Sequence, residues 1–368
     1  MSDSISENKR NYGIDLLRIV SMYLVVVLHV LGCGGILEAT KKYSVNYYVA
    51  WFLETSAFCA VDIFAMISGY VMVNKKINLI NIVPIWLNVF FYSSLITILF
   101  KIIPNLKSLY DVSTKELVKA IFFPVISRQY WYFTSYVGIF FLLPFVNKML
   151  CALNKNEYKK LCITILVVYS LLPVIGLKKI DLFNMEMGYS TAWLFCCYII
   201  GGYFNRFPFN LNKIKCFIIY IISIFCAWFA KFLSHFLLKN FLGIDEELDL
   251  FIDYTSIFII ISAISLLLLF SQIIINNVNI QKIISLLSSL AFSVYIIHVQ
   301  PYVFNYILRN LFKDLADCNP VELIYKCLLF ALLIFTICIC IDMIRLLLFR
   351  ILKINNIPKN FRKIYSIK

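Results

Sequence analysis

Long apolar runs follow one another along this chain, with only short polar stretches between them. Hydrophobic residues make up 62% of the sequence and charged residues only 15%, whereas a soluble domain of this length would carry far more surface charge. Apolar runs of about 20 residues are long enough to cross a bilayer as helices, which satisfy their own backbone hydrogen bonds there. The sequence therefore predicts one all-α, polytopic membrane domain that covers residues 1–368.

About ten membrane-spanning helices are expected from the lengths of these runs. The segment KELVKAIFFPVI at 115–126 is too short to cross a bilayer and is expected to lie at the membrane interface. The predicted spans are 14–34, 47–73, 80–103, 129–150, 160–177, 191–205, 214–237, 251–276, 283–308 and 323–350.

The uneven distribution of lysine and arginine between the predicted loops indicates the orientation. Cytoplasmic loops carry an excess of these residues, and an even number of spans puts both termini on the same side. With both termini cytoplasmic, acidic residues such as Glu38, Asp181 and Glu322 fall outside. The net charge of +14 then follows from topology, and the lack of a basic soluble face argues against nucleic-acid binding. The basic residues expected inside are Lys9, Arg10, Lys75, Lys76, Lys148, Lys155, Lys159, Lys160, Arg206, Lys213, Lys215, Lys282, Arg350, Lys353, Lys359, Arg362, Lys363 and Lys368.

The first predicted span, NYGIDLLRIVSMYLVVVLHVLGCGG, carries ionisable side chains, which are costly in a membrane and usually face a polar interior or a substrate path. Eleven helical steps from Arg18 to His29 return to within about 20° of one face and rise about 16 Å. Asp15 projects to the same side. The pattern favours a site that begins near one surface and ends deep in the membrane. A structural interpretation stays open, in which Arg18 pairs with Asp15 or reaches the headgroups and His29 bonds a neighbouring helix.

The second predicted span contains both acidic and small residues. Glu54 and Asp62 are eight positions apart and fall on one broad face, with Glu54 expected near the outer surface. Ser68 and Gly69 are small, so they would permit a close helix approach or a local break.

The fourth and ninth predicted spans carry aromatic and polar interruptions. Trp131 at the start of the fourth span is typical of an interfacial aromatic belt, although its ring and the hydroxyl of Tyr136 would also suit a sugar ring. In the ninth span, Pro301 is expected to free a carbonyl about one turn upstream. His298, just before it, is equally compatible with a structural role and a role in the site.

Two further patterns point to structure rather than chemistry. Asp342 and Arg345 are spaced to pair on the last span. The twelve cysteines lie mostly inside apolar spans, and no Cys/His spacing suggests zinc, so we expect buried thiols and no metal site.

The spacing Arg18-x10-His29, with Asp15 upstream, resembles the signature of the acyltransferase-three family of integral membrane acyltransferases. Later segments resemble the family in the same order, and together they cover essentially the whole chain. They are AVDIFAMISGYVMVNKK, YWYFTSYVGIFFLLPFVN, WLFCCYIIGGYF and FSVYIIHVQPYV.

The resemblance implies a multi-pass protein of the bacterial cytoplasmic membrane that transfers an acyl group, commonly acetyl. The donor would be cytoplasmic acyl-coenzyme A, a co-substrate rather than a bound cofactor, and the acceptor a hydroxyl of a cell-surface glycan or a lipid-linked sugar. In that family the residues that match Arg18 and His29 are required for activity. Many members also have an arginine-rich stretch before the third span. Here it reads NKKINLINIVPIWLNVF, so Lys75 and Lys76 would have to supply its charge.

The residue types agree with this chemistry. A thioester is already activated, so the acceptor hydroxyl mainly needs a base, and histidine suits that task near neutral pH. We expect His29 to be the base, Arg18 to bind coenzyme phosphate or hold the acyl carrier in register, and Asp15 to orient Arg18. The remaining candidate site residues are Trp131, Tyr136, Ser68 and His298 for the acceptor, and Lys75 and Lys76 for the donor.

Three alternatives remain open at this point. The reaction either transfers the acyl group directly or passes through an acyl-histidine. A transporter or flippase of a glycan or acyl donor would also use polar intramembrane groups and a broken helix. A family member that has lost catalysis would serve as a membrane sensor or assembly partner.

Overall fold

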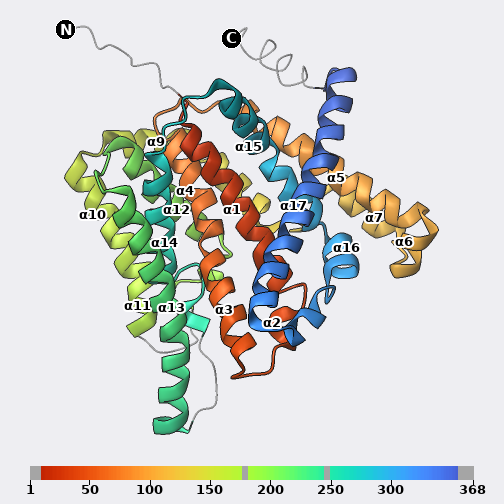
Figure 1. Ribbon diagram of the computed structural model, residues 1–368. Coiled ribbons are helices and arrows are strands. Elements are labelled where there is room, and N and C mark those ends of the chain that lie inside the picture. Colours follow the sequence, from red (N-terminus) through yellow and green to blue (C-terminus); the bar gives the residue numbers. More distant parts are fainter. Residues whose placement is uncertain (1–9, 176–180, 244–248, 355–368) are drawn as a thin grey trace, which may run out of the picture.

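The computed structural model describes residues 10–175, 181–243 and 249–354, and these residues form helices without any strand (Figure 1). In chain order the elements are α1 (Tyr12–Leu31), α2 (Ile36–Ala39), α3 (Val45–Phe58), α4 (Ala60–Met72), η1 (Leu79–Ile82), α5 (Val83–Ile102), α6 (Pro104–Leu109), α7 (Thr114–Phe122), α8 (Trp131–Phe140), α9 (Leu143–Ala152), α10 (Lys155–Leu166), η2 (Val167–Leu171), α11 (Leu172–Ile175), η3 (Glu186–Gly188), α12 (Thr191–Arg206), α13 (Lys213–Leu242), η4 (Asp249–Phe251), α14 (Ile257–Ser271), α15 (Val278–His298), α16 (Pro301–Val303), η5 (Phe304–Leu308), η6 (Lys313–Asp317) and α17 (Pro320–Ile351).

Six helical segments among the described residues are long and apolar enough to cross a membrane. They are α1 with α2, α3 with α4, η1 with α5, α13, α15 and α17. The pair α8 and α9 would be a seventh, bent by 62°. The chain is therefore an all-helical, multi-pass membrane protein.

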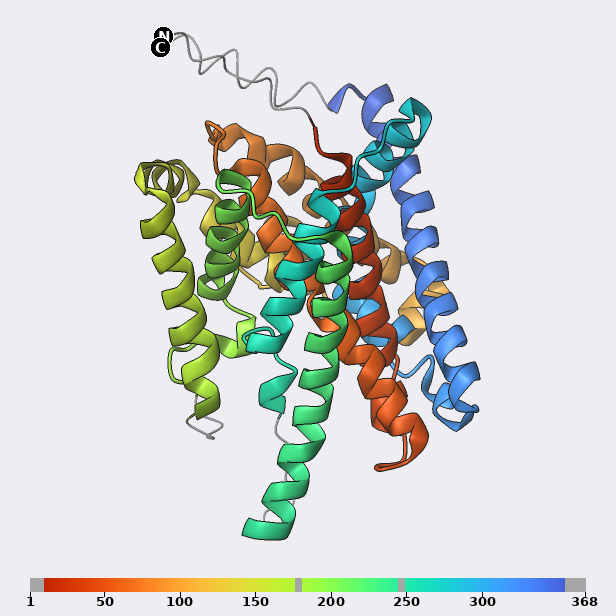
Figure 2. The same cartoon turned by 60° about the vertical axis from the view of Figure 1, so that its left-hand side comes forward.

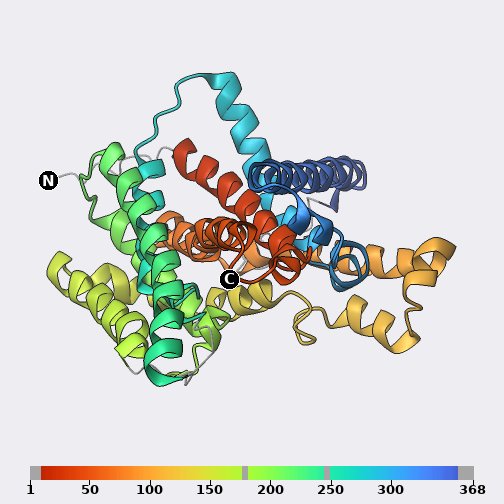
Figure 3. The same cartoon turned by 60° about the horizontal axis from the view of Figure 1, so that its bottom comes forward.

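The other predicted spans are helical but short. The segment at 160–177 falls on α10, η2 and α11, while α12 has 16 residues and α14 has 15. The total of ten spans therefore stays a prediction. The segment predicted not to cross, 115–126, contains the nine-residue α7, which lies with α6 on an arm at the far end of α5 (Figure 3).

The helix α1 lies between two groups of helices. On one side it packs against α4 and α14, and on the other against α15 and α17 (Figures 1 and 2). Its first half joins the hydrophobic cluster of α4, α12 and α14, and its second half joins that of α3, α5, α15 and α17. This central position brings side chains of α1 close to both groups.

The helices α4 and α12 approach each other closely at small residues. A Cβ at Gly69 would collide with the backbone of Tyr198, and one at Gly201 would collide with the backbone of Met66. Small residues at such crossings allow backbones to approach closely and to pack well in a membrane. The suggestion that Gly69 permits a close helix approach is therefore confirmed.

Basic residues gather at the end of the molecule where α1 begins. Arg10 shares one surface hollow with Lys75 and another with Lys282, and Arg206 donates to the backbone carbonyls of Leu150 and Leu153 at the end of α9. We call this the basic end. The helix α17 ends at this same end of the molecule (Figure 1). The first span therefore begins, and the last span ends, at the basic end. Its assignment to the cytoplasm remains a prediction.

Candidate active site

The start of α1 is fixed by its capping residue. The side chain of Asn11 accepts hydrogen bonds from the backbone N–H groups of Gly13 and Ile14 at 2.9 and 3.2 Å. Its amide also donates to the carbonyl of Ser271 at the end of α14, at 2.8 Å. A side-chain cap of this kind stabilises a helix by about 1 kcal/mol. It also fixes the first turns of α1, from which the acidic and basic site residues project.

Asp15 is the centre of a polar cluster at the basic end. It is 5% exposed and accepts hydrogen bonds from Nε of Arg10 at 2.5 Å, Nη1 of Arg18 at 3.2 Å and Oγ of Ser288 at 3.1 Å. Nη1 of Arg18 also donates to Oγ of Ser288 at 2.9 Å. Within the described part of the chain, Nε and Nη2 of Arg18 have no hydrogen-bond partner. Arg18 is therefore held through one nitrogen and keeps donors for a ligand.

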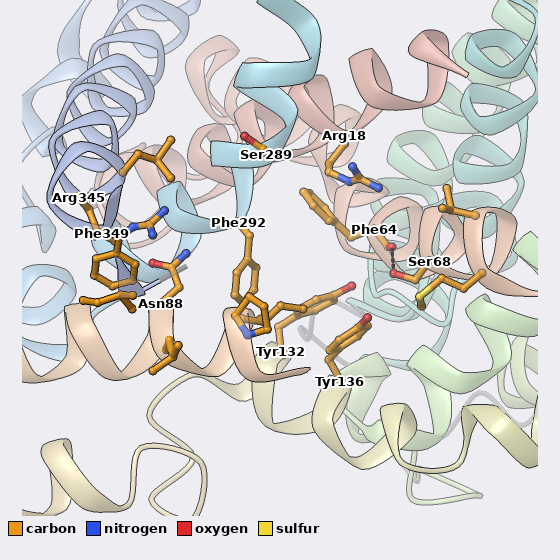
Figure 4. A pocket seen from close by; sticks show the side chains of 17 residues that line it. Arg18, Phe64, Ser68, Asn88, Tyr132, Tyr136, Ser289, Phe292, Arg345 and Phe349 are labelled. Carbon is orange, nitrogen blue, oxygen red and sulfur yellow. Dashed lines mark hydrogen bonds between the residues drawn. The ribbon is translucent and has the colours of Figure 1, made fainter. Parts of the chain in front are cut away.

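Arg18 lines a cavity of about 470 Å³ among α1, α4, α5, α8, α15 and α17. The hydroxyl groups of Tyr132 and Tyr136 point toward the side of this cavity that holds Arg18 and Ser68 (Figure 4). Arg345 lies at the other side (Figure 4). The cavity places Ser68 and Tyr136, two of the residues predicted for the acceptor, next to the arginine predicted for the donor.

A second hollow, of about 360 Å³, adjoins this cavity at the basic end and shares Arg18 with it. Lys75 lines the second hollow together with Arg10 and Asp15. Lys76 is exposed and is not among the residues that line either space. Of the two lysines predicted to bind the donor, the structure therefore brings only Lys75 to the arginine cluster.

His29 lies deeper along α1 and is paired with another histidine. Its Nδ1 is 2.8 Å from Nε2 of His298, and Nδ1 of His298 is 2.5 Å from the backbone carbonyl of Val294. The ring of Phe304 meets the ring of His29 edge-on, at 5.2 Å between centroids. His29 is thus held by a hydrogen bond on one side and by an aromatic contact on another.

A small pocket of about 60 Å³ exposes His29 to a group of aromatic side chains. The ring centroids of Trp131 and Tyr189 are 4.7 Å apart, and those of Tyr189 and Tyr254 are 5.0 Å apart. Trp131, at the start of α8, therefore contacts other aromatic rings and lines the pocket beside His29. Phe64, Tyr132 and Phe292 line both this pocket and the Arg18 cavity, so the two spaces adjoin but are not one cavity.

The helices α1 and α15 run in the same direction and in register. Arg18 meets Ser288, 270 residues further along, and His29 meets His298, 269 residues further along. Arg18 and His29 are thus each matched by a polar residue of α15 at the same depth. The polar face predicted on α1 is therefore paired with a polar face of α15 that carries Ser288 and His298.

One sequence expectation needs correction. His298 is only 1% exposed and lies behind His29, outside the lining of the Arg18 cavity and the aromatic pocket, so it is not placed to touch an acceptor. The interruption of the helix at Pro301 is present, because α15 ends at His298 and Pro301 begins α16. Glu54 is 7% exposed, so its side chain is buried.

The pair on the last span is confirmed as an ion pair and is also near the site. Arg345 donates to Asp342 from Nε at 2.5 Å and from Nη2 at 3.0 Å. Tyr92 donates to the same carboxylate at 2.7 Å. Beside this pair, Asn88 lines the Arg18 cavity and donates to Ser293 at 2.6 Å, while its own carbonyl oxygen has no partner among the described residues.

Sequence reasoning missed several residues of the site because their signals are weak. Ser288 lies in an ordinary Leu/Ser stretch, and Tyr189 and Tyr254 lie in connections before α12 and α14. Only the spacing of Ser288 and His298, ten positions apart, echoes the spacing on α1. Among the described residues, no group of three His, Cys, Asp or Glu side chains is arranged to hold a metal ion.

A protein-family profile covers nearly the whole chain. The profile of the acyltransferase domain of the acyltransferase-three family matches residues 11–345, from the cap of α1 to Arg345. The chain belongs to this family. It is therefore a membrane acyltransferase by family. No curated protein and no solved structure matches the chain.

Proposed function

We propose that this acyltransferase moves an acyl group, most simply acetyl, from cytoplasmic acyl-coenzyme A to a hydroxyl of a cell-surface glycan or a lipid-linked sugar. The observation that carries the proposal is the pair of adjoining spaces along α1. One holds Arg18, the other holds His29, and both include Tyr132 as a wall. A charged donor and a neutral acceptor would therefore approach one another at this wall, inside the bacterial cytoplasmic membrane.

The donor side is the Arg18 cavity with the hollow at the basic end. The volumes of about 470 and 360 Å³ lie in the range of small-molecule and cofactor pockets. Nε and Nη2 of Arg18 suit a bidentate bond to phosphate or to another oxyanion. Arg10 and Lys75 at the rim would add positive charge that attracts an anionic coenzyme. This arrangement supports a coenzyme that enters from the basic end.

The acceptor side is the aromatic pocket at His29. Tyr189 and Tyr254 come from connections that precede α12 and α14, and these two helices run toward the basic end, as the contact of Ser271 with Asn11 indicates for α14. Their aromatic rings therefore border the site from the opposite side of the molecule. Flat rings with hydroxyl groups suit a ligand that is apolar on its face and polar at its edge, as a sugar is.

The reaction follows from these positions. His29 removes the proton of the acceptor hydroxyl as its oxygen attacks the thioester carbonyl carbon. The C–S bond then breaks, and the proton passes from His29 to the sulfur of the departing coenzyme. Arg18 holds the coenzyme so that the two reacting groups stay in line, an effect of proximity that lowers the barrier. Asp15 limits the motion of Arg18.

Labelled acetyl-coenzyme A supplied to inside-out vesicles that contain the protein tests the proposal. An acyltransferase releases free thiol and places the label in an alkali-labile ester, and vesicles with the His29→Ala variant do neither. A transporter instead moves the label into the vesicle with the thioester intact. A member that has lost catalysis produces neither signal, and either of these last two results would contradict the proposal.

A further inference from the structure

We propose that His298 is a positioning residue that fixes His29 in the tautomer with the proton on Nδ1, so that Nε2 is the free base. The inference rests on the proposed function, in which His29 accepts the proton of the acceptor. It concerns a residue that touches neither cavity. It follows from the direction of two hydrogen bonds.

The position of the proton on His298 follows from its contact with the backbone. Nδ1 of His298 is 2.5 Å from the carbonyl oxygen of Val294. A carbonyl oxygen can only accept, so Nδ1 of His298 must carry the proton and donate it. In a neutral imidazole the other nitrogen is then an acceptor. Nε2 of His298 is therefore unprotonated.

The position of the proton on His29 follows from that on His298. Nε2 of His298 is 2.8 Å from Nδ1 of His29. Because Nε2 of His298 accepts, Nδ1 of His29 must donate, and Nε2 of His29 is left without a proton. Within the described part of the chain, Nε2 of His29 has no hydrogen-bond partner. The nitrogen with the free electron pair is thus the one that remains for the acceptor hydroxyl.

The opposite direction would need a charge that the surroundings do not support. His298 could donate from Nε2 to His29 only as a doubly protonated cation. It is 1% exposed and lies inside a membrane protein, where an unpaired charge is costly. No carboxylate among the described residues pairs with it. The neutral pair, with the direction from His29 to His298 to Val294, is the stable arrangement.

The helix break at the end of α15 holds His298 in place. Gln300 caps α16 by accepting hydrogen bonds from Tyr302 at 2.8 Å and Val303 at 3.3 Å, and its amide donates to Thr97 on α5 at 3.3 Å. The chain that follows carries Phe304 onto the ring of His29. His29 is therefore fixed in tautomer by His298 and in ring angle by Phe304.

The hydrogen bonds from His29 to His298 and from His298 to Val294 leave the proton balance of the reaction unchanged. Nε2 of His29 takes the hydroxyl proton while Nδ1–H continues to donate to His298, which keeps its own proton throughout. The cation formed transiently on His29 is stabilised by the lone pair of His298. The proton then leaves Nε2 for the coenzyme sulfur. His298 acts by orientation and by electrostatics, as the third member of a catalytic triad does.

Nitrogen-15 NMR of the full chain in lipid nanodiscs tests the tautomers directly. The sequence has only three histidines, so uniform histidine labelling with the His29→Gln and His298→Gln variants assigns the signals. We expect both His29 and His298 to carry the proton on Nδ1. A proton on Nε2 of His29 would overturn the inference, whatever the activity of the enzyme.

Kinetics of matched variants test the role. His298→Ala should lower kcat by about 10- to 100-fold, as loss of a partner that orients a histidine does, with little change in KM for acetyl-coenzyme A. His298→Gln keeps a side-chain carbonyl that accepts the Nδ1–H and should recover most of the rate. His235→Ala is the control, since it removes a buried histidine that bonds Tyr43 at 2.7 Å and lines neither space, and it should lower thermal stability more than kcat.

The outcomes separate the inference from the proposed function. If His29→Ala is fully active, the proposed base is wrong, although the tautomers measured by NMR still stand. If His29→Ala is inactive while His298→Ala keeps its kcat, the proposed function survives and the positioning role is wrong. If Gln gives no recovery over Ala at position 298, the hydrogen bond is not what His298 supplies, and this too contradicts the inference.

Discussion

The chain carries the same short pattern twice, an aspartate followed three residues later by an arginine, and the two copies border one cavity. On α17, Asp342 receives two hydrogen bonds from Arg345, at 2.5 and 3.0 Å. On α1, Asp15 receives one bond from Arg18, at 3.2 Å. The side chain of Arg345 is 9% exposed, against 28% for Arg18. The pattern alone does not decide which arginine is available to a ligand.

The difference arises from the other partners of each aspartate. Asp15 is also engaged by Arg10 and Ser288, so Arg18 is held loosely and keeps two nitrogens free. Among the described residues, Asp342 has only Tyr92 as a partner besides Arg345, which donates two hydrogen bonds to the carboxylate. The buried ion pair of Asp342 and Arg345 therefore stabilises the fold. The partly exposed cluster of Asp15 and Arg18 is available to bind a ligand.

The largest effect is expected at the pair on α17. Arg345→Ala leaves Asp342 buried without its cation, which should lower the free energy of unfolding by about 3–5 kcal/mol. Thermal unfolding in nanodiscs measures this, and kcat/KM per folded molecule should change little. The double variant Asp342→Leu/Arg345→Met should recover most of the stability. A stable Arg345→Ala protein with a large loss of kcat/KM would mean that Arg345 also binds a substrate.

Arg18→Ala should behave in the opposite way. We expect kcat/KM for acetyl-coenzyme A to fall at least about 100-fold, as loss of charge-assisted hydrogen bonds to a phosphate predicts, with a small change in unfolding temperature. Arg18→Lys should also be poor, because a compact ammonium does not reproduce a bidentate fork. Steady-state kinetics on purified protein measures both variants. Loss of stability with normal kcat/KM would assign Arg18 to the fold instead.

Ser288→Ala should have a moderate effect, because it removes one bond to Arg18 and one to Asp15. We expect KM for acetyl-coenzyme A to rise about fivefold, as the loss of about 1 kcal/mol predicts. The neighbouring Ser289→Ala is the matched control, since the hydroxyl of Ser289 also borders the Arg18 cavity but, among the described residues, bonds to the carbonyl of Leu286 in its own helix and not to Arg18. Equal effects of the two substitutions would argue against a specific role of Ser288 in holding Arg18.

Arg10→Ala should have the smallest effect. The side chain of Arg10 is 50% exposed, so its pair with Asp15 is screened by water and salt. We expect KM for acetyl-coenzyme A to rise about twofold at low salt and to match the wild type at high salt. An effect that is large and independent of salt would mean that Arg10 contacts the donor directly.

The half of the site on α1 was predictable from sequence because the helical repeat alone places Arg18 and His29 on one face. The partner half was not predictable. Ser288 and His298 reach α1 across about 270 residues, and only the packing of α1 against α15 sets that register. The prediction of an all-helical membrane protein is also confirmed. It too depends on local sequence, because the length and hydrophobicity of each apolar run are enough to predict a membrane-spanning helix.

Burial at loops and helix ends was the less predictable part. Trp131 is of a residue type typical of interfacial belts, and the sequence did not show that its ring contacts Tyr189 in the pocket beside His29. The sequence also did not show that the side chain of Glu54 is buried, which follows from the packing of α3 against α1, α13 and α17. Such outcomes depend on neighbours that are distant in the sequence, so local patterns do not determine them.

Turnover and unfolding temperature, measured on the same purified samples of wild-type protein and His29→Ala, test the central claim most directly. If His29 is the base, the substitution lowers acyl transfer from acetyl-coenzyme A by about 10²- to 10⁴-fold, and the protein unfolds at nearly the wild-type temperature. If His29→Ala transfers acyl groups at nearly the wild-type rate, His29 is not the base and the mechanism proposed for this site is wrong.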